Sequence, residues 1–265
     1  MNLAMPYWHV DAFAAEAFAG NQAAVMLLDR WLDDAVLQAI GAENMFAETA
    51  FLVPDASGAA DWELRWFTPA LEVRLCGHAT LASGHVLLTR DPVLERVRLR
   101  TRQAGVLEVR RDGAGYAVAL PAIPTARRTW DAAAALLGQP SEVWRSADDH
   151  YNVFVYATEQ QVRALAPDFK ALGAFGDVQF IATAAGDTAD VVSRVFVPGC
   201  GVDEDSVTGS AHAVLTPFWA DRLGHDSFTA FQASTRGGQL TCRRDGDSAW
   251  LGGTCVTVVE GTFRL

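Results

Sequence analysis

A long-range internal repeat constrains the fold of this chain more than any other feature. Arg65-Trp66-Phe67-Thr68-Pro69 returns as Arg194-Val195-Phe196-Val197-Pro198, and Cys76-Gly77-His78-Ala79-Thr80 corresponds to Thr208-Gly209-Ser210-Ala211-His212. Both pairs are about 130 positions apart, which is too long for a solenoid repeat and indicates two copies of a whole domain. Because ligands tend to bind between domains, we expect the functional site where the two copies face each other.

The expected domains are residues 1–120 and 125–265. A length of 265 residues suits two domains, and half of the residues are hydrophobic, which is enough for two cores. Pro121-Ala122-Ile123-Pro124-Thr125 is the expected linker, because each proline disfavours a helix at the residue before it. Whether the last strand stays in the second domain or crosses back to the first is left open by the sequence.

Each half shows strand patterns around one apolar helix. A helix expected over 77–88 has almost no polar face after Thr80, which predicts burial, and 209–223 repeats this pattern. We therefore expect an α+β fold of two pseudo-symmetric domains, each a curled, mostly antiparallel sheet wrapped around a central apolar helix. The other expected helices are 31–42 and 159–172, and strands are expected over 8–13, 49–53, 62–67, 97–111, 116–120, 151–157, 178–182, 191–197, 228–242 and 249–259.

Composition argues against several classes of partner. A net charge of −11 speaks against nucleic acid and anionic membrane surfaces, which need clustered Lys and Arg. The first ten residues lack the basic start and apolar run of a secretory signal, and no apolar stretch approaches the ~20 residues of a membrane span. The four cysteines show neither CxxC pairing nor histidines at metal spacing. We expect reduced thiols, a cytoplasmic location and no metal.

Two equivalent helix starts are candidate anion sites. Gly77 and Gly209 each follow a loop and open an apolar helix, which leaves backbone N–H groups and the positive helix end at both places. Two such ends facing one cleft would hold a carboxylate without Lys or Arg. The alternative interpretation is that Thr80, Thr208 or Ser210 simply caps a buried helix.

Three residues are candidates for proton transfer and substrate positioning. Glu48 lies between apolar residues before a strand, where a carboxyl has either a partner or an altered tendency to hold a proton. His78 follows the first helix start and could relay a hydrogen bond. Asp205 precedes the second start and could orient a substrate group. The structural alternatives are a salt-bridged Glu48, a His78 bonded to a carbonyl, and an Asp205 that caps the helix.

Cys76 remains ambiguous. A thiol at a helix start can be a base, and racemases without cofactor need two bases, one on each face of the carbon. The equivalent residue in the second copy is Thr208, whose hydroxyl is too weak an acid for that role. A buried, chemically silent cysteine is therefore the favoured interpretation.

These motifs, in this order, resemble the PhzF-like family, the phenazine-biosynthesis isomerase group with the diaminopimelate-epimerase fold. The resemblance covers almost the whole chain. Besides the segments already quoted, it rests on Val10-Asp11-Ala12-Phe13, Phe18-Ala19-Gly20-Asn21, Ala47-Glu48-Thr49-Ala50-Phe51, Glu72-Val73, Glu204-Asp205-Ser206-Val207-Thr208-Gly209-Ser210-Ala211 and Arg236-Gly237-Gly238.

The resemblance implies an interdomain active site, a homodimer, and catalysis without cofactor or metal. It implies that Glu48 is the family's catalytic Glu, His78 its substrate-positioning His and Asp205 its Asp, and these three are the expected catalytic residues. It also matches Asn21 to the family's early turn Asn, and Gly209 and Ser210 to the Gly and Ser at the start of its second helix. The expected substrate-binding residues are these three together with Gly77 and Ala79 at the first helix start. Gln22, Ala79 and Ser206 stand where the family often has proline, which affects the pocket more than the chemistry.

The expected function is a cofactor-independent isomerase that moves a proton within a small carboxylate substrate, with Glu48 as acid and base. Two alternatives remain open at this stage. One is an amino-acid racemase or epimerase that uses Cys76. The other is a binding protein that kept the fold and lost the chemistry, since a fold alone does not establish a function.

Overall fold

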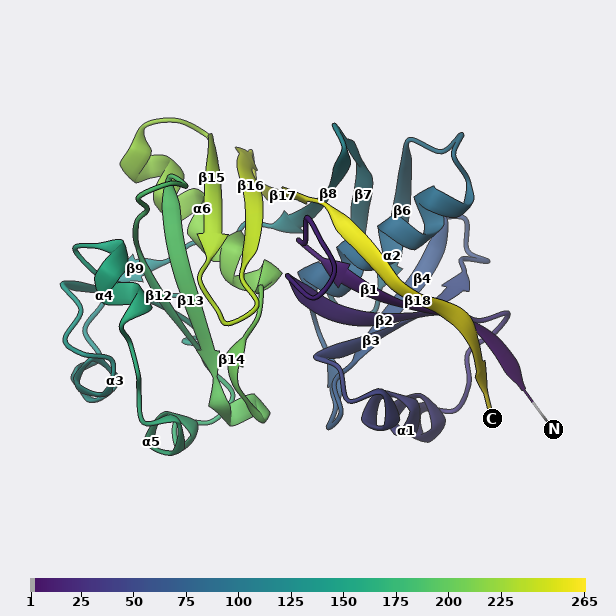
Figure 1. Ribbon diagram of the computed structural model, residues 1–265, viewed down its shortest axis with the longest axis horizontal. Coiled ribbons are helices and arrows are strands. Elements are labelled where there is room, and N and C mark those ends of the chain that lie inside the picture. The colour runs from purple at the N-terminus through teal and green to yellow at the C-terminus, as the bar shows by residue number, and fades with distance from the viewer. Residues whose placement is uncertain (1–2) are drawn as a thin grey trace. The chain divides into compact units, whose positions relative to one another are not determined.

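The computed structural model describes residues 3–265 and divides into two compact units. The first unit contains the residues up to Leu120 together with Gly252–Leu265, and the second is Pro121–Leu251. The end of the chain therefore belongs to the first unit. Its last strand, β18 (Cys255–Arg264), pairs antiparallel with β1 (Ala4–Ala12), and the two strands lie side by side in Figure 1.

The first unit is a curled sheet with one long buried helix and one helix nearer the surface. The long helix is α2 (Gly77–Arg90), and the other is α1 (Asp34–Asn44), which packs Leu37 and Ile40 onto the sheet. Besides β1 and β18, its strands are β2 (Asn21–Leu27), β3 (Glu48–Pro54), β4 (Trp62–Phe67), β5 (Glu72–Val73), β6 (Arg96–Thr101), β7 (Val106–Asp112) and β8 (Gly115–Pro121).

The second unit has the same order of elements around its own long helix, α6 (Gly209–Leu223). Its strands are β9 (Ala126–Arg127), β10 (Glu142–Arg145), β11 (Tyr151–Val155), β12 (Gln179–Ala185), β13 (Val191–Val197), β14 (Val202–Asp205), β15 (Ser227–Gln232), β16 (Gly238–Asp245) and β17 (Ser248–Gly253). Short helices α3 (Asp131–Leu136), α4 (Glu159–Arg163), α5 (Phe169–Gly173) and η1 (Pro198–Cys200) connect them.

Strand pairing in the two units matches one for one, which confirms the predicted duplication. The antiparallel pairs β1–β2, β3–β4 and β6–β7 correspond to β10–β11, β12–β13 and β15–β16. The parallel pairs β2–β3 and β4–β6 correspond to β11–β12 and β13–β15. Finally, β18 pairs with β1 in the first unit, and β9 pairs with β10 in the second. The last strand of the chain is therefore the counterpart of β9.

The repeated arginine of the sequence motif has the same structural role in both units. Arg65 makes a two-pronged contact with Glu72, with N–O distances of 2.8 and 2.7 Å, and its guanidinium lies 5.0 Å from the centre of the Phe67 ring. Arg194 does the same with Glu204, at 2.7 and 2.9 Å, over the Phe196 ring at 5.0 Å. Paired, ring-stacked guanidinium groups stabilise a fold. The motif therefore marks the scaffold.

Both long helices are buried, as their sequences predict. In α2, a Cβ on Gly84 would come within 2.2 Å of Val109, so a glycine is needed where the helix crosses β7 closely. In α6, Pro217 cannot donate to the carbonyl of Ala213, and that oxygen instead accepts a hydrogen bond of 3.1 Å from the Ile123 amide in the expected linker.

Some local predictions are wrong. The helix expected over 159–172 is two short helices, α4 and α5, because Pro167 disfavours helical geometry at Ala166 and Asp168 accepts from the Ala171 amide to start a new helix. The strand β2, which begins at Asn21, is absent from the predicted strands. By contrast, the segments 97–111 and 228–242, where strands were expected, each form two antiparallel strands joined by a turn at a positive-φ glycine, Gly105 or Gly237.

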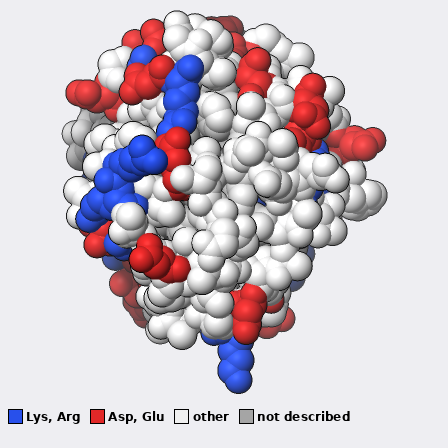
Figure 2. Space-filling model, turned by 90° about the vertical axis from the view of Figure 1, so that its left-hand side faces the viewer, with Lys and Arg blue, Asp and Glu red and all other residues white. Residues whose placement is uncertain are grey.

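The face shown in Figure 2 belongs to the side on which α3, α4 and α5 lie in Figure 1. Acidic and basic side chains are interspersed there, and a broad central area carries neither. Several of the second unit's arginines are paired with acids, for example Arg222 with Glu142 and Arg244 with Asp221 and Asp226. Among residues 3–265, the structure has no helix that is both long and apolar enough to cross a membrane.

Candidate active site

The first unit gathers ionisable side chains at the start of α2. Cys76 precedes the helix in an extended conformation, and neither a hydroxyl nor a carboxylate caps the first turn. Thr80, offered above as a possible cap, instead donates its hydroxyl back to the Cys76 carbonyl. Gly77 and Ala79, both predicted to bind substrate, form the buried first turn. The N-terminal end of α2, which carries partial positive charge, therefore lies next to the His78 side chain.

Glu48 and His78, predicted as catalytic, are in contact. Glu48 is the first residue of β3, and its Oε2 lies 3.1 Å from Nε2 of His78. The two atoms are buried but not aligned as a hydrogen bond, and neither has another hydrogen-bond partner among the described residues. The contact is therefore electrostatic, and both atoms retain capacity to bind a proton or ligand.

Two further side chains contact the other nitrogen of His78. The amide nitrogen of Asn21, a predicted substrate-binding residue, lies 3.1 Å from Nδ1, and Sγ of Cys76 lies 3.6 Å from it. With the Asn21 amide as donor, Nδ1 accepts and the ring proton of neutral His78 is on Nε2, which faces Glu48. We call Asn21, Glu48, Cys76 and His78 the first cluster.

Burial and the carboxylate set the protonation states of this cluster. Burial raises the pKa of the Cys76 thiol to about 11, and the negative charge of Glu48 adds to the rise. Burial alone would lower the pKa of His78, but Cys76 and Glu48 together hold it well above its ordinary value. Because Cys76 stays a neutral thiol at neutral pH, the Glu48 carboxylate is the group that stabilises the charged imidazole there.

The second unit gathers the remaining predicted site residues around the start of α6. Asp205 accepts a 2.7 Å hydrogen bond from the Thr208 hydroxyl, so it contacts the residue before the helix and caps no helical N–H through that bond. The side-chain oxygen of Gln232 accepts from the backbone N–H of Thr208 at 2.8 Å, and its side-chain nitrogen donates to the backbone carbonyl of Asp205 at 2.8 Å. Gly209 and Ser210 form the buried first turn. We call Asp205, Thr208, Ser210 and Gln179 the second cluster.

Gln179, which the sequence did not single out, is the structural counterpart of Glu48. Phe67 and Phe196 are the equivalent phenylalanines of the repeated arginine motif, and their strand partners are Thr49 and Phe180. Glu48 and Gln179 are the residues immediately before these partners. His78 and Ser210 are likewise equivalent in the two helices. Gln179 Nε2 donates to Ser210 Oγ at 3.0 Å, so an amide–hydroxyl pair occupies the place of the carboxylate–imidazole pair. Comparing the two repeats residue by residue beyond the motifs would have revealed this position.

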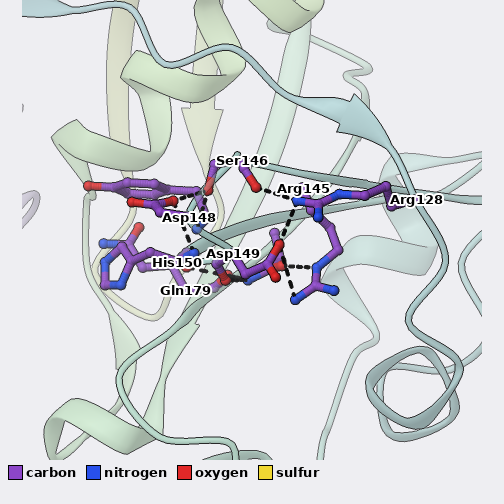
Figure 3. Close-up of polar contacts among 9 residues, drawn as sticks. Arg128, Arg145, Ser146, Asp148, Asp149, His150 and Gln179 are labelled. Carbon is purple, nitrogen blue, oxygen red and sulfur yellow. Dashed lines mark hydrogen bonds and ion pairs between the residues drawn. The ribbon is translucent and has the colours of Figure 1, made fainter.

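The residues next to Gln179 form a polar network, which Figure 3 shows. The backbone N–H of Gln179 donates to the backbone carbonyl of His150 at 2.7 Å. In the first unit, Asn21 lies two residues before Ala23, the strand partner of Glu48. In the second unit, Asp149 lies two residues before Tyr151, the strand partner of Gln179, so Asp149 occupies the place of Asn21. Its carboxylate is bonded to Arg128 at 2.5 Å and lies 3.6 Å from Arg145. The acid on this side is thus neutralised by two guanidinium groups.

Comparisons with known proteins identify the family. A family model described as phenazine biosynthesis-like protein matches residues 10–261. A Pseudomonas aeruginosa protein named as an uncharacterized isomerase is 42% identical over 264 residues, covering 98% of this chain and 99% of that protein. The crystal structure of a PhzF-family phenazine biosynthesis protein from Enterococcus faecalis has a TM-score of 0.90 at 39% identity, covering 99% of this chain and all of that one.

The chain belongs to the phenazine biosynthesis-like protein family. A hydroxyproline epimerase from Agrobacterium vitis, at 11% identity and a TM-score of 0.62 over 99% of this chain and 93% of that one, shares the fold. The predicted family resemblance and the epimerase-like fold are both confirmed.

At the three departures from the pattern noted above, this member of the phenazine biosynthesis-like family makes its own contacts. Gln22 bonds His9 at 3.2 Å, Ala79 is buried in α2, and the Ser206 carbonyl accepts from Ser234 at 2.7 Å.

Proposed function

We propose that this protein is an isomerase that moves a proton within a small carboxylate substrate, with Glu48 as the acid and base. The observation that carries the proposal is the Glu48–His78 contact: a carboxylate oxygen, buried and without an aligned hydrogen bond, lies 3.1 Å from a buried imidazole at a helix start. The names of relatives support the reaction class, since two Pseudomonas aeruginosa proteins at 42% and 43% identity are called isomerases.

The proposed reaction needs only the chain's own groups. Glu48 takes a proton from a carbon next to a carbonyl or double bond, and the electrons of the broken C–H bond join the adjacent π system. The protonated carboxyl then gives the proton to another carbon of that system, so atoms and electrons balance without a redox cofactor. Positive charge on His78 and the N-terminal end of α2 stabilise the negative charge that develops on the substrate.

The second cluster has a different role in the proposal. Asp205 orients a substrate hydroxyl or amine, and the first turn of α6 at Gly209 and Ser210 binds a carboxylate through its N–H groups and the serine hydroxyl. The support for these roles is the family resemblance of the motif from Glu204 to Ala211, together with the uncapped start of α6. The predicted homodimer and the absence of a cofactor stay part of the same proposal.

The test is a search for proton transfer in D₂O with a panel of small unsaturated, cyclic and amino-acid carboxylates, followed by ¹H NMR. We expect at least one compound to lose a C–H signal or form a rearranged product. Glu48→Gln keeps the shape of the side chain but removes the base, and should slow the reaction by about 10²–10⁴-fold. Glu43→Gln, on the exposed side of α1, is the matched control and should react like the native protein.

An active Glu48→Gln protein would refute the assignment of the base. If no compound reacts but several bind to native protein and to Glu48→Gln alike, the binding-protein alternative is favoured instead. Light scattering on the same samples tests the homodimer.

A further inference from the structure

Glu48, Cys76 and His78 combine three different metal-ligating groups in one place. One ligand atom from each lies within 4.8 Å of the other two, and these residues are the single such group of three His, Cys, Asp or Glu side chains found in residues 3–265. Cys76 and His78 are close in sequence, whereas Glu48 is far from both along the chain. The strand start at β3 brings its carboxylate to the beginning of α2.

The same trio contains two buried polar atoms whose hydrogen-bonding capacity is unused. His78 is 3% exposed, and its Nε2 has no aligned hydrogen-bond partner, nor does Oε2 of Glu48. Buried polar atoms normally have partners, and buried atoms without one call for an explanation such as a catalytic role or a bound ion. A proton, a substrate group or a metal ion could fill that role, and the third donor, a thiol, selects among metals.

A thiol, an imidazole and a carboxylate suit Zn²⁺ better than Mg²⁺ or Ca²⁺, which prefer oxygen ligands. Zn²⁺ bonds of about 2.0–2.3 Å in a tetrahedron place ligand atoms about 3.5 Å apart. The Nε2–Oε2 distance of 3.1 Å is close to this. The Cys76 thiol lies 3.6 Å from the other ring nitrogen, Nδ1, so its side chain must rotate toward Nε2 to complete the set. Three protein ligands leave a fourth position open.

Asn21 fits the role of the outer partner that a metal-bound histidine requires. Metal-ligating imidazoles donate their other ring N–H to a neighbouring acceptor, which fixes the orientation of the ring. In the structure the Asn21 amide nitrogen lies 3.1 Å from Nδ1, so a metal on Nε2 requires this amide to turn over, which lets its oxygen accept the Nδ1 proton. The cluster therefore supplies the three donors, and a turn of one amide supplies the orienting contact of a metal site.

We infer that Glu48, Cys76 and His78 bind Zn²⁺ or a similar borderline-soft divalent cation, and that the bound ion blocks turnover. The second clause rests on the proposed function: a Glu48 carboxylate that ligates a metal cannot also take a proton from the substrate. The first clause, binding, does not depend on the proposed function. The two are tested separately.

Co²⁺ is the probe for binding, because a cobalt–thiolate bond gives an intense charge-transfer band in the near ultraviolet. We expect native protein, purified with a chelator and dialysed, to show this band with Co²⁺ in a one-to-one ratio. Zn²⁺ should displace Co²⁺ and remove the band, and Mg²⁺ should not. Cys76→Ser should abolish the band and weaken Zn²⁺ binding, measured by calorimetry, on the order of 100-fold.

The matched control is Cys200→Ser. Cys200 is exposed and its thiol contacts Asp177 at 2.9 Å, and the same carboxylate oxygen lies 3.9 Å from His150, so a looser arrangement of the same three group types occurs there. The control should keep the band. The inference would be overturned if the band persisted in Cys76→Ser or was lost in Cys200→Ser. It would also be overturned if native protein showed no band. Circular dichroism of each variant separates loss of a ligand from loss of the fold.

The second arm measures the proton-transfer reaction found in the D₂O panel. Zn²⁺ should inhibit native protein and Cys200→Ser at the concentrations that displace Co²⁺, and inhibit Cys76→Ser less, relative to its own rate without metal. Binding without inhibition would overturn the inhibitory clause and also argue against Glu48 as the base. Absence of binding would leave the proposed function standing, because that function needs no metal.

Discussion

The two clusters differ in chemistry while their scaffolds agree. In the first, Glu48 faces His78 across 3.1 Å; in the second, Gln179 donates to Ser210 across 3.0 Å, at equivalent places on equivalent strands and helices. Where the first unit has Glu48 and His78, the second has Gln179 and Ser210. Both second-unit side chains are non-ionisable, yet they still make a polar contact. The duplication has therefore kept two helix starts that can hold an anion, and only one of them carries an acid–base pair.

Two buried histidines show what the carboxylate contributes. His78 and His212 are both almost fully buried, in α2 and α6. Burial lowers the pKa of His212 to about 4, with only the Thr208 carbonyl opposing it, whereas the pKa of His78 lies well above its ordinary value because of its charged neighbours. The same side chain at the same depth is thus neutral in one unit and able to carry charge in the other.

Moving the carboxylate should give the largest effect. The double variant Glu48→Gln, Gln179→Glu restores the number of carboxylates but places the acid beside Ser210. If the Glu48–His78 pair is the acid–base unit, we expect the double variant to be as slow as Glu48→Gln alone, about 10²–10⁴-fold below native protein. Rates are measured with the substrate found in the D₂O panel.

Gln179→Glu by itself is the control, because it shows whether a carboxylate at that position disturbs the fold or the reaction. Recovery of most of the native rate in the double variant would mean that the two clusters are interchangeable, and the comparison would fail.

The fold could be predicted well because the signals that define it are periodic and repeated. The apolar runs at 77–88 and 209–223 predicted the two buried helices, and the repeated arginine motif indicated the duplication that the Arg65–Glu72 and Arg194–Glu204 contacts express. The helix expected over 159–172 failed at Pro167, where a local steric rule outweighed the apolar spacing.

The site could be predicted only where the sequence motif itself carries the chemistry. Glu48 and His78 were singled out, and the structure brings them together, yet their contact depends on strand register that no local pattern encodes. Gln179 was missed because a glutamine at the start of a strand has no chemical signature of its own. Its meaning appears only when β12 is aligned with β3 through their pairing with β13 and β4.

The depressed pKa of His212 predicts a specific dependence of stability on pH. Between its ordinary value of 6.5 and about 4, the unfolded chain binds a proton at this residue and the folded chain does not, so stability falls as the pH is lowered through this window. The loss reaches about 3 kcal/mol for the one residue. His212→Asn, whose amide can replace the 2.8 Å hydrogen bond to the Thr208 carbonyl, should lose less.

Urea unfolding at about pH 7 and about pH 4.5 measures this difference in the free energy of unfolding. Acidic groups elsewhere add to the loss in both proteins, so the comparison between native protein and variant isolates His212. Equal losses in both would contradict the assignment.

Removing the Gln179 side-chain bond should have a smaller effect, on substrate binding. Gln179→Leu leaves the Ser210 hydroxyl without its donor, and it also removes the Oε1 atom that is buried without a hydrogen-bond partner. The two changes oppose each other in stability, so little change in melting temperature is expected. A hydroxyl that is no longer held should raise KM about fivefold, the equivalent of one net hydrogen bond, with kcat much less affected.

Gln239→Leu, on the exposed side of β16, is the matched control and should leave both constants unchanged. A fall in kcat comparable to that of Glu48→Gln would show instead that the second cluster takes part in proton transfer.

Replacing the Cys76 thiol should have the smallest effect on turnover and decides between one base and two. Burial raises its pKa to about 11, so very little thiolate exists at neutral pH, and the equivalent residue, Thr208, offers no second base. Cys76→Ser should therefore slow proton transfer only a few-fold, through the loss of its 3.6 Å contact with His78. A racemase that uses this thiol would instead lose deuterium incorporation at the substrate α-carbon altogether. The same ¹H NMR assay measures both results, and complete loss in a folded Cys76→Ser protein would move the base from Glu48 to the thiol.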